Sequence, residues 1–573
     1  MVRRLLIANR GEIAVRLIHA CRELGVSSVV ACTESERSSM PAELADAVAP
    51  VESYLDAAGL VAAGLDAGAD AVHPGYGFLS EDPRFADATI AAGMTWVGPP
   101  PEAMRALGDK IQARRLAEDA RVPVVPGAVG DDGALVAAGR ELATPLLVKA
   151  AAGGGGRGMR AVDDLDRLPA AIAEARQEAE AAFGDDRVFL ERRLTDARHV
   201  EVQILADAHG NVAHLGERDC SLQRRHQKVV EESPSPAVDA DLRGRLGQAA
   251  CALAARAGYV SAGTVEFLVS GDGQFRFLEM NARLQVEHPV TEAVTGVDIV
   301  HAQLAIADGG VVSSSSDMAH RGHAIEARIY AEDPANGFIP GGGRVERLTL
   351  PRWPGVRIDT ALRRGDRITF DFDPLLAKVI AFDEDRPACL RRLRAALEAT
   401  EIVGVTTNLG FLIEILADPD VAEGRVDTDW IERTWRGDVP PLPDGVRATD
   451  SVEHDTWHAF GPGAATPREV VVAGGWAQYR GWAYRLDDDD LGSVGLPPPG
   501  GSLTASMPAV VLRVHVVEGD RVGVGDAMVV LEAMKMQTIV RTPTAGTVTA
   551  VLARTGDTVA AGQTLVRIEE DAS

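Results

Sequence analysis

Lysine is nearly absent from this 573-residue chain. Only five of its 58 lysines and arginines are lysines. The arginine side chain is a planar, permanently charged fork, whereas lysine carries a compact charge and, when neutral, a primary amine that can be acylated. Each remaining lysine is therefore a candidate functional position. The five are Lys110, Lys149, Lys228, Lys378 and Lys535.

Cysteine is also scarce, and long apolar runs are missing. The five cysteines are scattered and include no C-x-x-C pair, which argues against a disulfide framework and against a zinc site. No stretch approaches the roughly 18 apolar residues of a membrane-spanning helix. The apolar run at 5–8 is too short for a signal peptide. The sequence therefore predicts a cytoplasmic protein that does not associate with membranes.

Positive charge is outnumbered. The 58 basic and 84 acidic residues give a formal net charge of -26. This charge repels nucleic acid, so any phosphate site must be local. The composition, 46% hydrophobic and 25% charged, is that of a globular protein. At about 150 residues per domain, the length predicts three or four domains.

The first hundred residues have the pattern of a doubly wound parallel sheet. An apolar segment at 2–8 precedes a helix that begins at 9–12 and ends at Gly25, and a second apolar segment follows at 28–32. Strand, glycine-containing turn, helix and strand in this order form a βαβ unit.

The rest of the front half and the linker divide by composition. Up to about residue 325, helices mix with β-hairpins, and 326–435 has an α+β pattern. Proline clusters and an acidic run give 436–504 the composition of a semi-rigid linker, in which 469–473 and 482–486 are candidate strands.

The last 70 residues contain an internal repeat. Residues 518–532 recur 37 positions later as 555–569, with a shared Gly-Asp-x-Val-x-x-Gly turn. Two equivalent all-β halves predict a flattened barrel with a pseudo-two-fold axis. Lys535 lies between the halves, flanked by Met534 and Met536, and we expect it at an exposed hairpin tip, where methionines are unusual.

A glycine-rich loop follows an apolar strand at 146–148. Consecutive glycines at 153–156 let backbone N–H groups surround phosphate oxygens. The loop lacks the G-x-x-x-x-G-K-[ST] order, so it is not a Walker loop. A flexible surface loop is the alternative, but Lys149 at the end of the strand favours phosphate binding.

A predicted hairpin brings two carboxylates together. Asp272-Gly273 is a typical two-residue type I′ turn between apolar strands. Counting outward from this turn pairs Glu266 with Glu279, about 4.5–5.5 Å apart at Cβ. Two such carboxylates repel unless a cation lies between them, and Asn281 on the same face could add an oxygen. Carboxylates with phosphates are the usual Mg²⁺ ligands, although solvent-exposed, splayed glutamates are the alternative.

Two charge-dense segments complete the inventory. They are 217–232 and 281–292, rich in groups suited to acid–base and anion chemistry. The charge pattern alone favours a solvated surface over a functional site for each segment.

Taken together, these motifs resemble known families. The Ala-Met-Lys-Met segment at 533–536 resembles the biotin-attachment site of biotin carboxyl carrier domains. Residues 2–435 resemble biotin carboxylases of the ATP-grasp superfamily. The segments that carry this second resemblance are 7–14, 73–81, 108–110, the glycine-rich loop, 198–201, 218–232 and 279–292.

The resemblance implies a multidomain α/β and α+β protein. Its expected parts are a biotin carboxylase N-terminal domain at 1–110, an ATP-grasp domain with a lid at 111–325, a C-terminal α+β domain at 326–435, a linker or partner-docking region at 436–504 and an all-β biotinyl carrier domain at 505–570.

The resemblance also implies site residues. ATP would contact Lys110, Lys149, Gly154, Gly155, Gly156, Glu191, His199, Gln223 and His226. Mg²⁺ or Mn²⁺ would bind Glu266, Glu279 and Asn281, and bicarbonate would bind Lys228, Arg283, Gln285 and Val286. The catalytic set would be Glu287 as general base with Arg283, Lys228 and Arg357, the last stabilising the biotin enolate.

The implied reaction is the ATP-dependent carboxylation of biotin on Lys535 through carboxyphosphate, with Glu287 taking the proton of bicarbonate. Such a chain is similar to the α-type subunit of an acyl-CoA carboxylase. It would work in an oligomer with a carboxyltransferase β subunit, after a biotin protein ligase has attached biotin. Three alternatives stay open: a non-catalytic carrier, a pyruvate- or urea-type component, and another ATP-grasp ligase with a lipoyl-like tail. Lys378 has no assigned role.

Overall fold

The computed structural model describes residues 1–153, 158–313, 320–443, 470–486, 502–505, 509–533, 536–559 and 563–570. Gly154, Gly155, Gly156 and Lys535 lie outside these described residues. Within the described part, no helix combines the length and the apolar character needed to cross a membrane.

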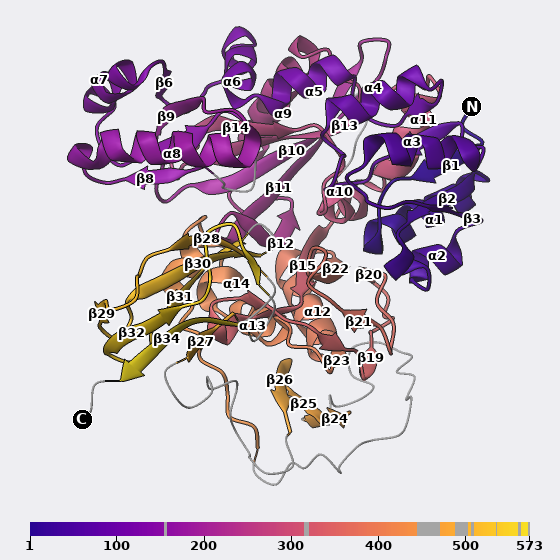
Figure 1. The fold of residues 1–573 in the computed structure, drawn as a ribbon. Coiled ribbons are helices and arrows are strands. Elements are labelled where there is room, and N and C mark those ends of the chain that lie inside the picture. The colour runs from indigo at the N-terminus through magenta and orange to yellow at the C-terminus, as the bar shows by residue number, and fades with distance from the viewer. Residues whose placement is uncertain are drawn as a thin grey trace.

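The N-terminal domain is the predicted doubly wound parallel sheet (Figure 1). In its first unit, helix α1 (Gly11–Leu24) connects two adjacent parallel strands, and Gly25 ends the helix with a φ of 70°. The strands lie in the order β3-β2-β1-β4-β5. Their bounds are β1 Arg4–Ile7, β2 Ser27–Cys32, β3 Ala47–Pro50, β4 Ala71–His73 and β5 Thr95–Trp96, with helices α3 Ala57–Asp66 and α4 Pro83–Ala91.

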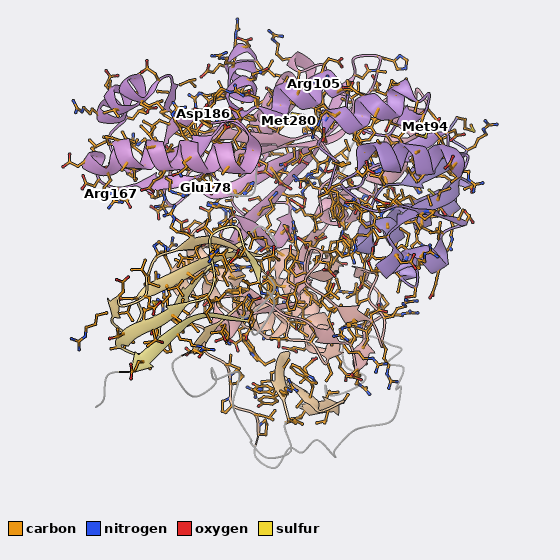
Figure 2. The ribbon with its side chains drawn as sticks, viewed as in Figure 1. Met94, Arg105, Arg167, Glu178, Asp186 and Met280 are labelled. Atoms are coloured by element: carbon orange, nitrogen blue, oxygen red, sulfur yellow. The ribbon has the colours of Figure 1, made fainter. Side chains whose placement is uncertain are left out.

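A separate four-stranded sheet carries the ends of the glycine-rich loop. The strands, in the order β6-β9-β7-β8, are β6 Gly127–Val129, β7 Leu146–Ala150, β8 Arg160–Val162 and β9 Val188–Arg192. Helix α8 (Leu168–Phe183) packs against this sheet, and its Glu178, labelled in Figure 2, accepts a hydrogen bond from the Gly158 N–H at 3.1 Å. This unit, together with α7 (Asp132–Leu142), lies on the opposite side of Figure 1 from the N-terminal sheet.

The largest sheet has eight strands in the order β14-β13-β10-β11-β12-β15-β22-β20. It continues across the predicted domain boundary at 325, because β12 pairs with β15 in antiparallel fashion. Residues far apart in the chain are therefore aligned on one surface. The bounds are β10 Arg198–Ala206, β11 Val212–Arg224, β12 Gln227–Ser233, β13 Ser261–Val269, β14 Phe275–Asn281, β15 His323–Tyr330, β20 Val356–Thr360 and β22 Leu375–Asp383.

The β13–β14 hairpin differs from the prediction in two ways that cancel. Its loop has three residues, because the Ser270 N–H donates to the Gln274 carbonyl and Gly273 adopts a φ of 74°. The predicted two-residue turn was therefore wrong. A bulge then shifts the register between Glu266 and Phe267, which restores the predicted pairing of Glu266 with Glu279.

The region after the central sheet folds around helix α12 (Arg386–Glu398) and a three-stranded meander. The meander consists of β24 (Val470–Ala473), β25 (Trp476–Tyr479) and β26 (Trp482–Arg485). Two of these strands were expected within the linker, and the middle one was not. Gln478 fixes the meander to the preceding domain, because it accepts from the Ile402 N–H and donates to the Thr400 carbonyl, each at 2.8 Å.

The C-terminal domain is the predicted two-sheet barrel. Its sheets have the orders β27-β34-β32-β29 and β31-β30-β28-β33, so equivalent strands of the repeat hold equivalent places. β28 (Ala509–Val514) recurs 37 positions later as β32 (Gly546–Val551), and β30 (Ala527–Ala533) as β34 (Thr564–Glu570). The remaining strands are β27 Ser502–Thr504, β29 Arg521–Val522, β31 Met536–Arg541 and β33 Thr558–Val559.

Candidate active site

A row of charged side chains crosses the central sheet. Register pairs Glu279 with Glu266, Glu266 with Glu201, and Glu201 with Arg218, over four adjacent strands. Directly paired residues of an antiparallel sheet lie on the same face. Three carboxylates are thus gathered within one surface, and they require cations close by.

Lys228 on β12 supplies the central cation. Its ammonium lies 2.5 Å from a Glu201 oxygen, 2.9 Å from Glu266 Oε1 and 2.6 Å from Glu287 Oε1. Burial disfavours the charged ammonium, but the surrounding glutamates outweigh burial and hold the pKa of Lys228 well above its ordinary value. The lysine is therefore a fixed positive charge at the meeting point of three strands and one loop.

Glu287 is completely buried and ionised. One of its oxygens binds Lys228, and the other accepts a hydrogen bond from Arg328 at 2.9 Å. Burial alone would raise the pKa of Glu287, but Lys228, Arg328 and Arg218 together hold it well below its ordinary value. The carboxylate is ready to accept a proton only when one of these cations is engaged elsewhere.

Arg328 on β15 is the second cation beside the predicted base. Its guanidinium also forms an ion pair with Glu231, whose pKa burial raises to about 7 although Arg328 opposes this. Arg328 was not among the predicted site residues. A usable signal lies in strand 323–330, where Glu326 and Arg328 alternate with apolar residues and so predict one polar face.

Arg218 and Glu201 are two further residues that the prediction missed. Arg218 has no exposed surface and donates to Glu201, Gln203, Thr264 and Thr291. Arg218 therefore fixes the Glu201 carboxylate, which also binds the Lys228 ammonium. Their sequence setting offers no spacing signal, because the two are brought together only by the β10–β11 register.

The predicted nucleotide residues fall into two groups. Lys149, at the end of β7, forms a buried 2.8 Å ion pair with Glu191, which Arg114 also contacts at 3.1 Å. Lys110 begins helix α6 (Lys110–Asp119), donates to the Gly153 carbonyl and lies 3.3 Å from Glu279. Lys110 thus links the start of the glycine-rich loop to the carboxylate row.

His199 joins the nucleotide side to the carboxylate row. Its Nε2 lies 2.9 Å from Glu266 Oε2, and Gln223 contacts its Nδ1 at 3.5 Å. Burial opposes the charged imidazolium, but Glu266 outweighs burial and raises the pKa of His199. His226 lies in the two-residue turn between β11 and β12 with a φ of 65°. Burial lowers the pKa of His226, and the charges of Lys149 and His199 add to this shift.

The segment after β14 contains the predicted bicarbonate residues. Arg283 donates to the side-chain oxygens of Gln285 at 2.7 Å and Asn281 at 3.0 Å. Arg283 also forms an ion pair with Glu81 of the N-terminal domain at 3.1 Å. The backbone carbonyl of Val286 accepts a hydrogen bond from Lys378 at 2.9 Å.

Arg357 lies in a different cluster from the one predicted. Its described contacts are a 2.6 Å bond to Glu292 and two 2.8 Å bonds to Asp359, and none is with Lys228, Arg283 or Glu287. Burial disfavours the charged guanidinium, but Asp359 and Glu292 raise the pKa of Arg357 above its ordinary value. Among the described residues, the arginine that forms an ion pair with Glu287 is Arg328, which lies on β15 of the central sheet.

The predicted metal ligands are chemically suited to a hard cation. Glu266, Glu279 and Asn281 offer only oxygen ligands, on adjacent strands, and Mg²⁺ prefers oxygen. Glu266 contacts the Lys228 ammonium and the His199 ring, and Glu279 lies 3.3 Å from Lys110. Positive charge is therefore what this place in the sheet requires.

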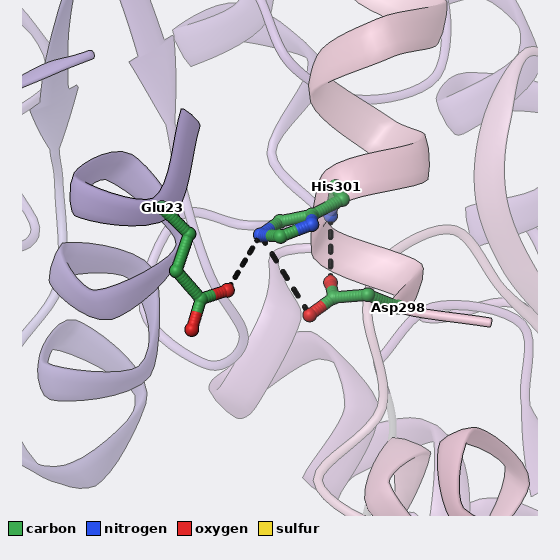
Figure 3. A group of neighbouring side chains, drawn as sticks. All are labelled: Glu23, Asp298 and His301. Carbon is green, nitrogen blue, oxygen red and sulfur yellow. Dashed lines mark hydrogen bonds and ion pairs between the residues drawn. The ribbon is translucent and has the colours of Figure 1, made fainter. Parts of the chain in front are cut away.

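A second carboxylate–histidine group lies outside this site, between α1 and α11 (Ile299–Ala307). His301 Nε2 lies 3.1 Å from Glu23 and 3.8 Å from Asp298, and Figure 3 shows the three side chains facing one another. The same Asp298 oxygen also lies 2.7 Å from Arg16, and the other Asp298 oxygen caps the His301 N–H. Asp298 in this surface group is engaged by Arg16 and by the helix cap.

Comparison with family profiles follows the same order along the chain. The matches are "Biotin carboxylase, N-terminal domain" at 1–104, "Carbamoyl-phosphate synthase L chain, ATP binding domain" at 109–314, "Biotin carboxylase C-terminal domain" at 326–433 and "Biotin-requiring enzyme" at 493–568.

Known proteins and solved structures agree with these profiles. The biotin-dependent acyl-coenzyme A carboxylase alpha3 subunit of Mycobacterium leprae is 39% identical over 99% of both chains. The propionyl-CoA carboxylase alpha chain of Ruegeria pomeroyi is 40% identical over 82% of this chain and 73% of its own. The structure of a biotin carboxylase–β,γ-ATP complex from Campylobacter jejuni matches with a TM-score of 0.74 and 38% identity, over 76% of this chain and 99% of that one.

A second structure is the biotin carboxylase domain dimer of 2-oxoglutarate carboxylase from Hydrogenobacter thermophilus, solved with MgADP and bicarbonate. It has a TM-score of 0.74 and 41% identity, over 76% of this chain and 98% of that one. Fold and site together define an ATP-grasp biotin carboxylase joined to a biotin carrier domain. The chain belongs to the family of biotin-dependent acyl-CoA carboxylase alpha subunits.

Proposed function

We propose that this chain uses ATP and bicarbonate to carboxylate biotin attached to its own Lys535. The observation that supports this most directly is the Lys228 ammonium, held between Glu201, Glu266 and Glu287. One fixed cation with a buried carboxylate beside it is what binding and deprotonation of a small anion require.

Glu287 is the general base in this proposal. Burial alone would raise the pKa of Glu287, but while Lys228 binds the carboxylate this pKa is held well below its ordinary value. A bicarbonate that binds to Lys228 takes a share of that ammonium's hydrogen bonds. The basicity of Glu287 then rises at the moment when a proton must be removed.

Phosphate and metal binding belong to the neighbouring strands. Lys149 lies on the strand before the glycine-rich loop and Lys110 contacts the first glycine of the loop, Gly153, and both would pair with phosphate oxygens there. Glu266, Glu279 and Asn281 would hold the divalent cation, which would screen the charge of the nucleotide phosphates. Binding ATP in place of the internal pairs of Lys149 and Lys110 would leave Glu191 paired with Arg114 and would free Glu279 from Lys110.

We assign to Arg328 the role that the sequence suggested for Arg357. Arg328 lies beside Glu287 on the same surface as Lys228, where it can stabilise negative charge that develops on the biotin ring. Arg357 is engaged by Glu292 and Asp359 and would act through the segments that carry them.

The proposal extends to location, domain division and partners. The boundaries at 110, 325, 435 and 504 would separate the functional units. Alpha subunits of acyl-CoA carboxylases work with a carboxyltransferase subunit, and we propose such a partner here, with an acyl-CoA as acceptor, a biotin protein ligase that modifies Lys535, and an oligomeric assembly. All five cysteines are free thiols, and burial raises the pKa of Cys21 and Cys389 to about 12, which fits a reducing cytoplasm.

The test is to incubate the purified, biotinylated chain with ATP, Mg²⁺ and labelled bicarbonate, without a partner. We expect label bound to Lys535. A confirmed biotinylated chain that binds ATP but acquires no label would overturn the proposal and favour a carrier without catalytic activity.

A further inference from the structure

Lys378 on β22 is the one lysine of the front half without an assigned role. Its side chain has no exposed surface. Burial disfavours an ammonium, yet Glu12, Glu326 and Asp359 outweigh burial and raise the pKa of Lys378. A fully buried charge is stable only when it is well paired, so the partners of this lysine indicate what it does.

The partners come from three separate parts of the chain. The Lys378 ammonium donates to the Val286 carbonyl at 2.9 Å, and it lies 3.3 Å from Glu12 and 3.5 Å from Asp359. Glu12 is on α1 of the N-terminal domain, which packs beside β20, and Asp359 is on β20 itself (Figure 1). Lys378 therefore ties both elements to the loop before Glu287.

The bond to Val286 bears directly on Glu287. The Val286 carbonyl belongs to the peptide group that joins the two residues, and a peptide group is planar. A hydrogen bond to this oxygen fixes the orientation of the plane from which Glu287 projects. The preceding carbonyl, that of Gln285, is likewise held, by the His288 ring at 2.7 Å.

The far end of the same segment is also fixed by cations. Glu287 leads into helix α10 (His288–Thr295), and Glu292 on that helix binds Arg16 of α1 at 3.0 Å and Arg357 of β20 at 2.6 Å. The elements that hold Lys378's carboxylate partners thus also hold α10. Among the described side chains, Lys378 is the one that binds the Val286 carbonyl, in the peptide group just before Glu287.

We propose that Lys378 is a positioning residue for Glu287, an inference that rests on the proposed function. By fixing the Val286–Glu287 peptide, it aligns the Glu287 carboxylate with Lys228 and Arg328. Because it is held in turn by Glu12 and Asp359, this alignment depends on the packing of α1 and β20 against the central sheet.

The test compares Lys378→Met, which keeps the length but cannot donate, with the unmodified biotinylated chain. We expect the KM for bicarbonate to rise about tenfold or more and kcat to fall, because small misplacements of a reacting group have large effects, while the KM for ATP stays within about twofold. Equal changes in both KM values, or none, would overturn the proposal.

Hydrogen exchange gives a readout that does not depend on turnover. In Lys378→Met, peptides covering 285–290 should exchange about tenfold faster, because the Val286 carbonyl loses the ammonium that holds it and the amides of the segment open more often. Unchanged exchange in this segment would contradict the proposal even if activity falls. An unmodified chain without bicarbonate-dependent ATP cleavage would overturn the proposed function instead, and the exchange data would still decide on Lys378.

A matched control and a milder variant complete the design. Arg386 is also a cation that binds a carboxylate, Glu232, and two main-chain carbonyls, at 421 and 422, but its described bonds do not reach Glu287 or the peptide before it. Arg386→Met should lower thermal stability without changing the bicarbonate KM or the exchange of 285–290. If Lys378→Met does not fold, Glu12→Gln keeps the Val286 bond but removes one anchor of the ammonium. It should raise the bicarbonate KM about threefold, and no change in KM would refute the proposal.

Discussion

The central sheet and the C-terminal barrel differ in how many charged side chains they bury. In the sheet, Lys378 and Arg218 are buried, Lys228 is largely buried, and each is matched by carboxylates or backbone oxygens. In the described part of the barrel, the buried core is apolar, and Thr542 is the buried polar residue. Charges fixed in the sheet serve chemistry that depends on orientation, whereas the barrel needs only to be a stable support for one modified side chain.

The first prediction separates the two regions completely. Lys535→Ala should abolish retention of label from bicarbonate on the chain, because the amine that carries biotin is gone. Carboxylation of added free biotin should continue slowly, since the sheet is unchanged. The measurement is label on protein against label in free biotin. Loss of both activities in a folded variant would show that the two regions do not act independently.

The second prediction removes the proposed base, Glu287, which lies just before helix α10 beside the central sheet. Glu287→Gln keeps the shape of the side chain but cannot accept a proton as a carboxylate does. Bicarbonate-dependent ATP cleavage should fall about 10²- to 10⁴-fold, with ATP affinity unchanged by equilibrium binding. Turnover equal to that of the unmodified chain would exclude Glu287 as the base, and the barrel variant Glu518→Gln, at an exposed position, serves as the control.

The third prediction distinguishes two arginines of the same sheet. Arg328→Met should reduce carboxylation of free biotin about 10²-fold, because a cation beside the reacting groups is lost. Arg357→Met should reduce it by about tenfold or less, because Arg357 contacts Glu292 and Asp359 instead. The reverse order of effects, in variants of equal thermal stability, would restore the prediction made from the sequence.

The smallest effect concerns pH and stability. Burial raises the pKa of Glu332 from 4.5 to about 7, although Arg224 lowers it. The folded chain therefore binds this proton more tightly than the unfolded chain, and the free energy of unfolding decreases as pH rises from 4.5 through about 7. Glu332→Gln should flatten this slope by on the order of 1 kcal/mol per pH unit.

Thermal melting between pH 5 and pH 8 measures the slope. The barrel variant Glu518→Gln should leave it unchanged, because Glu518 is exposed. A slope in Glu332→Gln equal to that of the unmodified chain would show that another group titrates.

The sequence by itself determined the parts of this protein that depend on local pattern. The βαβ start, the repeat of the barrel and the family resemblance all follow from residues close together in the chain. The pairing of Glu266 with Glu279 was also predicted, but a bulge was needed to compensate for a longer turn. Spacing along one hairpin is local information, and it was enough to predict which two glutamates pair, although not the length of the turn.

Only the tertiary structure decided which cation accompanies which carboxylate. Arg328 and Glu287, Glu201 and Lys228, and Lys378 and Val286 are 27 to 92 positions apart in the chain. These contacts depend on the order and register of eight strands, which join the regions before and after residue 325 into one sheet. Strand register is set by the summed packing of both sheet faces, so no short spacing in the chain encodes it.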